Sequence, residues 1–234
     1  DVVLIIGFCY HIIGKRLLEY VKIKYRCELC LWDTDAGNIL KRREKTIFFI
    51  QNELKFYDHI FSFSKNMVLY FRELGFKNVH YLPFGCKIIP VKLSEPQDQD
   101  IDISFVGTPD MRRLFLLERI KQFNIVCYGK NWIKYEQIVS KDFKNKIIPK
   151  NIWDDELWKV IKRSKIVLNI CNSDFHGIES GVNLRVFEAL AARRFLLTEH
   201  CEELRELFKI GEELDTFRSC LLYTSDAADE LDGV

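Results

Sequence analysis

Residues 166–199 read IVLNICNSDFHGIESGVNLRVFEALAARRFLLTE and decide the fold. The run Ile166–Ile170 is short, β-branched and bounded by polar residues, which predicts a buried strand. A loop rich in Asn, Ser, Asp and Gly follows, and Asn183 is placed to cap a helix that runs to about Ala192. The run Phe195–Thr198 predicts a second strand. Such a strand–loop–helix–strand unit is typical of an α/β layer.

The predicted helix carries two charged side chains beside its apolar stripe. At 100° per residue Glu188 lies at the edge of the stripe, with Arg185 next to it. A carboxylate that borders a buried face needs a partner. That partner is either Arg185, in an i,i+3 ion pair without a function, or a ligand with hydroxyl groups docked where the helix N-terminus and the preceding loop offer N–H groups to an anion. The stripe itself consists of Leu184, Phe187, Leu190 and Ala191.

A family resemblance rests on the order of residues in this helix. Asn183, Arg185, Phe187 and Glu188 form the pattern N-x-R-x-F-E, followed by A-L-A-A and the strand FLLT. This pattern resembles the donor-site signature of the CgeB-like (spore maturation protein-like) glycosyltransferases, which have the GT-B fold. The family usually has Gly where this chain has Arg193 or Arg194. The similarity covers most of residues 1–219 and includes Asp102–Gly107, Tyr128–Trp132, Glu203–Phe208 and Gly211–Glu213.

The resemblance implies a fold and an activity. The fold is α/β, with two Rossmann-like domains that contain parallel sheets, truncated at both ends. The activity is transfer of a sugar from a nucleotide-diphospho-sugar to an unknown glycan, protein or lipid-linked acceptor, without a metal and without a cofactor other than the donor substrate. In related enzymes the residue equivalent to Glu188 binds the ribose hydroxyls, and the helix N-terminus faces the diphosphate.

The domain organisation follows from composition. Strands alternating with helices up to Leu82 predict a first α/β layer, and the apolar run Val2–Phe8 predicts a buried strand rather than a signal peptide. The polar run 87–100 contains two prolines and marks a boundary. We therefore expect the C-terminal part of an acceptor-side domain over 1–92, a linker over 93–100 and a donor domain over 101–219. Residues 220–234 resemble a translated sequencing adapter, or form a frayed polar tail, and receive no function.

Bulk properties narrow the possible partners. The 234 residues carry a net charge of +1, which gives no electrostatic case for binding nucleic acid or an anionic membrane. No apolar run reaches the ~18 residues of a transmembrane helix. Among eight cysteines only Cys27 and Cys30 form a close pair, so we expect no metal site and a reduced, cytoplasmic protein.

Several strand ends supply further candidate residues. Gly107 follows a predicted strand and precedes Arg112 and Arg113, which suits either a phosphate or a simple turn with solvated arginines. Tyr128 ends the next strand near the same sheet edge, and the resemblance implies that 147–151 lies against the nucleobase. His176, in the loop before the helix, would touch the sugar or be a mobile loop histidine.

The first domain offers a candidate general base. Asp33 and His11 follow predicted strands, where an aspartate would either deprotonate an acceptor hydroxyl or close the strand with an Asx turn. The complete predicted donor-binding set is Gly107, Arg112, Tyr128, His176, Ser180, Gly181, Val182, Asn183, Arg185 and Glu188. Two other functions remain open: a nucleotide-sugar epimerase of the same fold and a catalytically inactive nucleotide-binding or interaction module.

Overall fold

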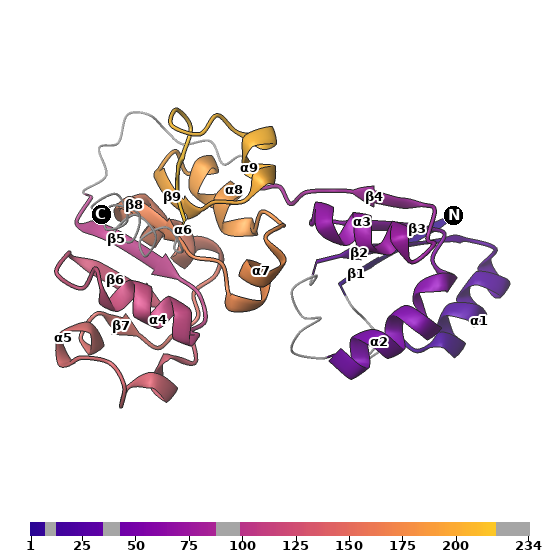
Figure 1. Cartoon of the computed structure of the whole chain (residues 1–234), viewed down its shortest axis with the longest axis horizontal. Coiled ribbons are helices and arrows are strands. Elements are labelled where there is room, and N and C mark those ends of the chain that lie inside the picture. The colour runs from indigo at the N-terminus through magenta and orange to yellow at the C-terminus, as the bar shows by residue number, and fades with distance from the viewer. Residues whose placement is uncertain (8–12, 35–42, 88–98, 219–234) are drawn as a thin grey trace, which may run out of the picture. The chain divides into compact units, whose positions relative to one another are not determined.

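The computed structural model describes residues 1–7, 13–34, 43–87 and 99–218 (Figure 1). The chain divides into two compact units. The first unit comprises Asp1–Phe84 together with Ser173–Val182. The second comprises Gly85–Asn172 and the residues from Asn183 onward. Most of the linker predicted over 93–100, and all of the tail predicted over 220–234, lies outside the described residues.

The first unit contains a parallel sheet of four strands in the order β1-β2-β3-β4. The register places Leu4 opposite Cys30 and Leu31 opposite Ile60. Its strands are β1 (Val2–Ile6), β2 (Glu28–Asp33), β3 (His59–Ser62) and β4 (Val79–Tyr81). Its helices are α1 (Lys15–Tyr25), α2 (Arg43–Asn52), η3 (Leu54–Phe56), α3 (Lys65–Glu73) and α7 (Ser173–Ile178). Successive strands step in one direction, and right-handed crossovers therefore place α1, α2 and α3 on the same face of the sheet.

Strand β1 corrects the prediction of a fully buried strand over Val2–Phe8. Ile5 is buried at 7% exposure, whereas Val2, Leu4 and Ile6 are 53–63% exposed. Side chains alternate between the two faces of a strand, and only the face towards the helices is covered among the described residues. Residues 8–12 lie outside the described part of the chain.

The second unit contains a parallel sheet of six strands in the order β10-β9-β8-β5-β6-β7. Figure 1 labels β5 to β9 of this sheet. Its strands are β5 (Ile101–Val106), β6 (Ile125–Tyr128), β7 (Ile147–Ile148), β8 (Ser164–Asn169), β9 (Phe195–Glu199) and β10 (Asp215–Phe217). Its helices are α4 (Met111–Glu118), η4 (Trp132–Tyr135), α5 (Lys141–Lys144), α6 (Asp154–Arg163), α8 (Leu184–Ala191) and α9 (Glu202–Leu207). Val167 and Leu168 of β8 are both buried, so this strand is covered on both faces.

Helix α8 buries a different face from the predicted one. The predicted stripe included Leu184, which is 43% exposed, while Val186 and Ala189 are buried at 1% and 0%. The buried positions are small or β-branched, which lets the helix lie close to β8 and β9. Phe187 is only half-buried and packs against Phe208, with ring centroids 5.8 Å apart.

The C-terminus of α8 ends in a left-handed turn. Ala192 caps the helix, and Arg193 then takes a left-handed conformation with φ 56°. Glycine is favoured at this position after a helix because a Cβ is strained there. This turn favours glycine, and the chain makes it with an arginine.

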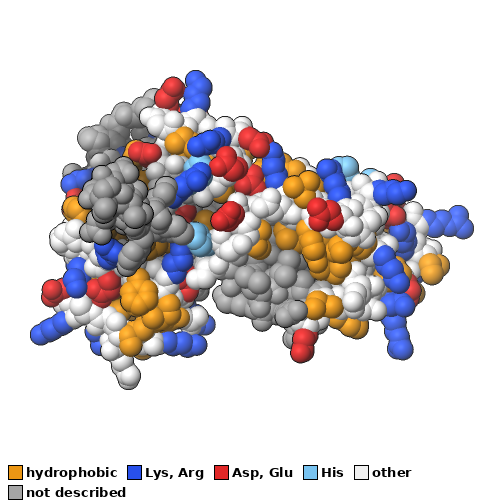
Figure 2. All heavy atoms as spheres, in the orientation of Figure 1, with side chains coloured by type: hydrophobic (Ala, Val, Ile, Leu, Met, Phe, Trp, Pro, Cys, Tyr) orange, Lys and Arg blue, Asp and Glu red, His pale blue; other side chains and the backbone are white. Residues whose placement is uncertain are grey.

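Charged side chains of both signs are interspersed on the face shown in Figure 2. Several form exposed ion pairs, for example Lys150 with Glu156 and Lys165 with Asp102, each at 2.6 Å. Exposed pairs contribute little to stability because water screens them. The pairs of Arg112 with Glu199 and of Arg185 with Glu188 are more deeply buried, so screening by water does not describe them.

We expect Arg193→Gly to stabilise the second unit by about 0.5–1 kcal/mol, because it removes left-handed strain at a small cost in backbone entropy. Urea unfolding followed by circular dichroism measures the change. Arg193→Ala keeps a Cβ at the same φ and should give no gain. Equal stabilisation by both substitutions would show that loss of the charge, and not relief of strain, is the cause.

Candidate functional site

In the second unit, the chain adds strands first on one side of β5 and then on the other, so the strand order reverses between β5 and β8. From β5 the chain proceeds to β6 and β7 on one side, then returns to β8 on the other side of β5 and continues to β9. Ligands of open parallel sheets bind outside the carboxyl ends of the strands at such a switch point. The segment that leaves β5 at this edge leads into α4, and the segment that leaves β8 passes through α7 before it reaches α8.

Gly107 and Gly129 lie against each other at this edge. A Cβ on Gly129 would be 2.1 Å from the Gly107 carbonyl oxygen, so only glycine fits. The Gly107 N–H donates to the Tyr128 carbonyl at 2.9 Å, and its carbonyl accepts from Trp132 Nε1 at 3.1 Å. Close packing of two backbone segments accounts for Gly107, and its N–H is already bonded within the protein.

Two arginines at the start of α4 hold the peptide that follows β8. Arg113 donates through Nε and Nη2 to the Ile170 carbonyl at 3.0 and 2.6 Å, and through Nη1 to Thr108 at 2.7 Å. Arg112 donates to the Cys171 carbonyl at 3.1 Å and forms an ion pair with Glu199. Both arginines therefore bind protein groups, and neither is simply solvated.

Glu199, at the end of β9, also holds the backbone that follows β8. Its carboxylate is 4% exposed, and it accepts a hydrogen bond from the Cys171 N–H at 2.8 Å as well as pairing with Arg112. The backbone at Ile170 and Cys171 is consequently held from α4 on one side and from β9 on the other. This fixes the point at which the chain leaves β8.

Asn183 caps α8, as predicted. Its side-chain oxygen accepts from the Arg185 N–H at 3.1 Å, and its Nδ2 donates to Asn169 Oδ1 at 3.0 Å. Asn169 in turn donates to Thr198 Oγ1 at 2.8 Å. Asn169 and Thr198 are buried, so this chain of polar groups orients the cap from within the sheet.

Arg185 and Glu188 form a half-buried ion pair in α8. Arg185 Nη1 lies 2.5 Å from Glu188 Oε2, and each side chain is 15% exposed. Burial raises the pKa of the Glu188 carboxyl, against the opposing effect of Arg185. Burial also lowers the pKa of the Arg185 guanidinium, which Glu188 opposes. The i,i+3 pair left open by the sequence is therefore present, and it is poorly solvated.

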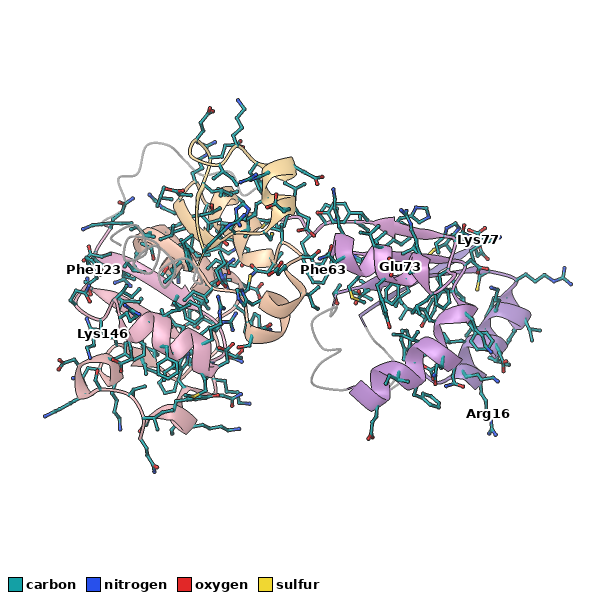
Figure 3. The ribbon with its side chains drawn as sticks, in the orientation of Figure 1. Arg16, Phe63, Glu73, Lys77, Phe123 and Lys146 are labelled. Atoms are coloured by element: carbon teal, nitrogen blue, oxygen red, sulfur yellow. The ribbon has the colours of Figure 1, made fainter. Side chains whose placement is uncertain are left out.

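The predicted loop before α8 contains a helix, α7, and lies in the first unit. Ser180 Oγ is 2.8 Å from Ser64 Oγ and accepts from the Asn66 N–H at 3.2 Å. Gly181 has φ +99° and lies so close to Phe63, labelled in Figure 3, that a Cβ would be 2.6 Å from its ring. Ser180 and Gly181 thus contact the start of α3. Val182 is buried and His176 is half-buried in the same segment.

The two candidate catalytic residues stay predictions. Asp33 ends β2, is fully buried, and accepts a hydrogen bond from Ser62 Oγ at 2.9 Å. This geometry favours the strand-closing alternative, because an acceptor hydroxyl would have to reach a buried carboxylate. His11 lies outside the described residues.

The unit-two candidates form a continuous set of contacts. Tyr128 bonds to Gly107, the arginines of α4 hold Ile170 and Cys171, and Asn183 approaches Cys171 Sγ at 3.9 Å. Our sequence reasoning missed Asn169, Thr198 and Glu199. A signal was present, because each is a polar residue inside or directly after an apolar strand and would need a buried partner.

The residues that the structure describes contain no cluster of three or more His, Cys, Asp or Glu side chains that could hold a metal ion. None of the helices in this part of the chain is long and apolar enough to cross a membrane.

Comparison with known proteins gives the family. A family model described as glycosyl transferase-like matches residues 112–232, just over half of the chain. The chain therefore belongs to this glycosyl transferase-like family. Over 90 residues it is also 30% identical to the spore protein CgeB of Bacillus subtilis (strain 168), a match that covers 35% of this chain and 27% of CgeB. The family match extends through most of 220–234, where we predicted a non-native tail.

Solved structures share the fold. Anabaena HepE in complex with UDP-glucose matches 98% of this chain and 69% of its own, with a TM-score of 0.64 and 11% identity. Sucrose-phosphate synthase from Thermosynechococcus elongatus matches 98% of this chain and 64% of its own, with a TM-score of 0.63 and 13% identity. The match to HepE in complex with UDP and glucose covers 64% of the HepE chain. The α/β fold of the GT-B type, with parallel Rossmann-like sheets, is confirmed.

We expect Gly129→Ala to destabilise the second unit by about 3 kcal/mol, because the new methyl group overlaps the Gly107 carbonyl and must displace it. Urea unfolding gives the value. Gly85→Ala is the matched control, since a Cβ there has nothing within 4 Å and should change stability by less than about 0.5 kcal/mol. Similar midpoints for the two variants would contradict the close approach.

Proposed function

We propose that the second unit binds the nucleoside diphosphate part of a nucleotide-sugar, and that the protein transfers the sugar to an acceptor. The observation that carries this proposal is the position of Asn183, Arg185 and Glu188 at the start of α8, the helix of the second unit that follows β8 at the switch point. Membership of the glycosyl transferase-like family supports it. The titles of similar structures also name UDP-glucose for HepE and a UDP-forming reaction for a synthase of Burkholderia xenovorans.

The diphosphate would be held by the N-terminus of α8 and by Arg185. Backbone N–H groups and the positive end of the helix dipole favour an anion there. The guanidinium adds a planar array of donors that matches phosphate oxygens. Together they would stabilise the leaving diphosphate electrostatically, and a metal ion would not be required.

Glu188 would accept hydrogen bonds from the ribose hydroxyls. It is one helical turn beyond Arg185, so one ligand can contact both side chains. The nucleobase would lie towards residues 147–151, which begin with β7. Strands β8 and β7 are separated by three strand spacings, roughly 14 Å.

Other members of the predicted set receive narrower roles. Arg112 would act mainly by shaping the backbone after β8, because Glu199 and Cys171 already bind it. Tyr128 stays a candidate contact at the end of β6. His176, Ser180, Gly181 and Val182 stay candidate contacts. Asp33 and His11 stay candidates for the general base, and the acceptor stays open as a glycan, protein or lipid-linked group.

The proposed compartment is the cytoplasm. All six cysteines within the described residues are free. Burial raises the pKa of several of them, to about 12 for Cys201, which suppresses the reactive thiolate. Thiols of this kind suit a reducing compartment.

We expect Glu188→Gln to weaken UDP binding by about 1–3 kcal/mol, the value of hydrogen bonds to a charged acceptor. Isothermal titration calorimetry on the intact chain measures the affinity. Glu212→Gln removes an exposed carboxylate from the same unit and should leave it unchanged. Unchanged UDP affinity in Glu188→Gln would reduce Glu188 to a structural partner of Arg185.

A panel of nucleoside diphosphates, scanned by thermal unfolding in a metal chelator, tests the function as a whole. Binding stabilises the native state by about 2.7 kcal/mol when the ligand is at one hundred times its Kd. We expect one diphosphate to raise the melting temperature without a metal. No shift with any of them would refute donor binding, and a shift that needs a divalent cation would refute metal independence. Interconversion of 2-epimers of a nucleotide-sugar without an acceptor would instead identify an epimerase.

A further inference from the structure

The position of Arg185 is unfavourable for helix stability. It lies in the first turn of α8, which contains no acidic residue. The helix dipole is positive at this end and disfavours a cation by a few tenths of a kcal/mol or more. A cation at this position therefore needs a nearby anion, and the nearby Glu188 supplies one at 2.5 Å.

The ion pair leaves part of the guanidinium unused. Arg185 Nε is buried and has no hydrogen-bond partner among the residues that the structure describes. A buried donor without a partner costs free energy and is uncommon in native structures. Glu188 engages Nη1, so the Nε donor points to an acceptor that the described chain does not provide.

Glu188 therefore competes with any anion that approaches Arg185. If a phosphate takes over the guanidinium, the Glu188 carboxylate loses its partner in surroundings where burial already raises its pKa. Breaking one half of a buried ion pair is strongly unfavourable because the other charge stays buried. A ligand that offers only phosphate oxygens has no group to compensate Glu188.

A nucleoside diphosphate can compensate it. Its phosphates replace Glu188 at Arg185, and its ribose hydroxyls replace Arg185 at Glu188. Both charged side chains then keep hydrogen-bonded partners. Each half of such a ligand makes binding of the other half more favourable, which is a coupling free energy within one site.

We propose, building on the proposed function, that the Arg185–Glu188 pair is a specificity device that rejects free phosphate and pyrophosphate and accepts a ligand that brings hydroxyls and phosphates together. Glu188 determines specificity in two ways. It binds the ribose, and it withholds the guanidinium from inorganic anions.

The test compares inorganic pyrophosphate with UDP by calorimetry on the intact chain. Glu188→Gln removes the competitor, so pyrophosphate affinity should rise by about tenfold, equivalent to about 1.4 kcal/mol. UDP affinity should fall in the same variant, because the lost contacts to two hydroxyls outweigh the relief of competition. A merely structural ion pair would not produce changes of opposite sign.

Two controls isolate the mechanism. Glu202→Gln removes the same charge from another i,i+3 pair of the second unit, with Arg205, and should change pyrophosphate affinity by less than about twofold. The double variant Arg185→Gln, Glu188→Gln should show no gain in pyrophosphate affinity, because the guanidinium that would bind pyrophosphate is absent. Thermal unfolding checks each variant. If Glu188→Gln is not folded, Glu188→Ala is measured in its place with the same expected gain, since alanine favours a helix.

The outcomes separate the two levels of the proposal. If UDP does not bind the wild-type chain, the proposed function fails and this inference fails with it. If UDP binds, but pyrophosphate affinity in Glu188→Gln is unchanged or lower, the specificity device is refuted and the proposed function stands. A gain that persists in the double variant also refutes the device, because Arg185 is then not the receptor.

Discussion

The backbone immediately after β8 is the constraint on which the candidate site depends. Its polar groups are buried at the edge of the sheet, and such groups must find partners. Arg112, Arg113 and Glu199 satisfy the peptide groups of Ile170 and Cys171 from two neighbouring elements. With that exit point held, Asn169 can orient Asn183, and Asn183 can set the first turn of α8. The position of Arg185 and Glu188 follows from this sequence of contacts.

The two buried ion pairs at this end of the second unit therefore have different roles. The pair of Arg112 with Glu199 is tied to backbone groups and acts as part of the frame. The pair of Arg185 with Glu188 is bonded within one helix, and it leaves the buried Nε donor of Arg185 without a partner among the described residues. The pair of Arg112 with Glu199 keeps its contacts when a ligand binds, whereas Arg185 and Glu188 are able to exchange partners. We assign ligand binding to the second pair for this reason.

Much of the fold followed from the sequence because local patterns there agree with the tertiary structure. The apolar run near 166–170, the cap at Asn183 and the strand from Phe195 were predicted, and the observed elements match them within one or two residues at most ends. The alternation of strands with helices also led us to predict parallel sheets, and both sheets are parallel. The prediction that Arg185 and Glu188 are neighbours needed only helix geometry, and it is confirmed as an ion pair.

The rest depended on contacts that a linear pattern does not contain. Periodicity on α8 favoured the large residues as the buried face, but close packing against the sheet selected Val186 and Ala189. Gly107 looked like a phosphate-binding glycine, although the approach of Gly129 explains it. The segment 173–182 was read as a loop beside α8, yet Ser180 bonds to Ser64, more than one hundred residues away. Roles for Asp33 and His11 stay predictions, and so do the domain boundaries.

The central claim is that the first turn of α8, with Arg185 and Glu188, binds a nucleoside diphosphate. Backbone amide shifts of the isotope-labelled chain, followed by NMR during titration with UDP, test it most directly. The account predicts that the largest changes map to residues 183–188, with smaller changes in 107–113 and 147–151. Changes confined to the first unit's β1–β4 sheet, or no saturable change in any of these segments, would contradict it.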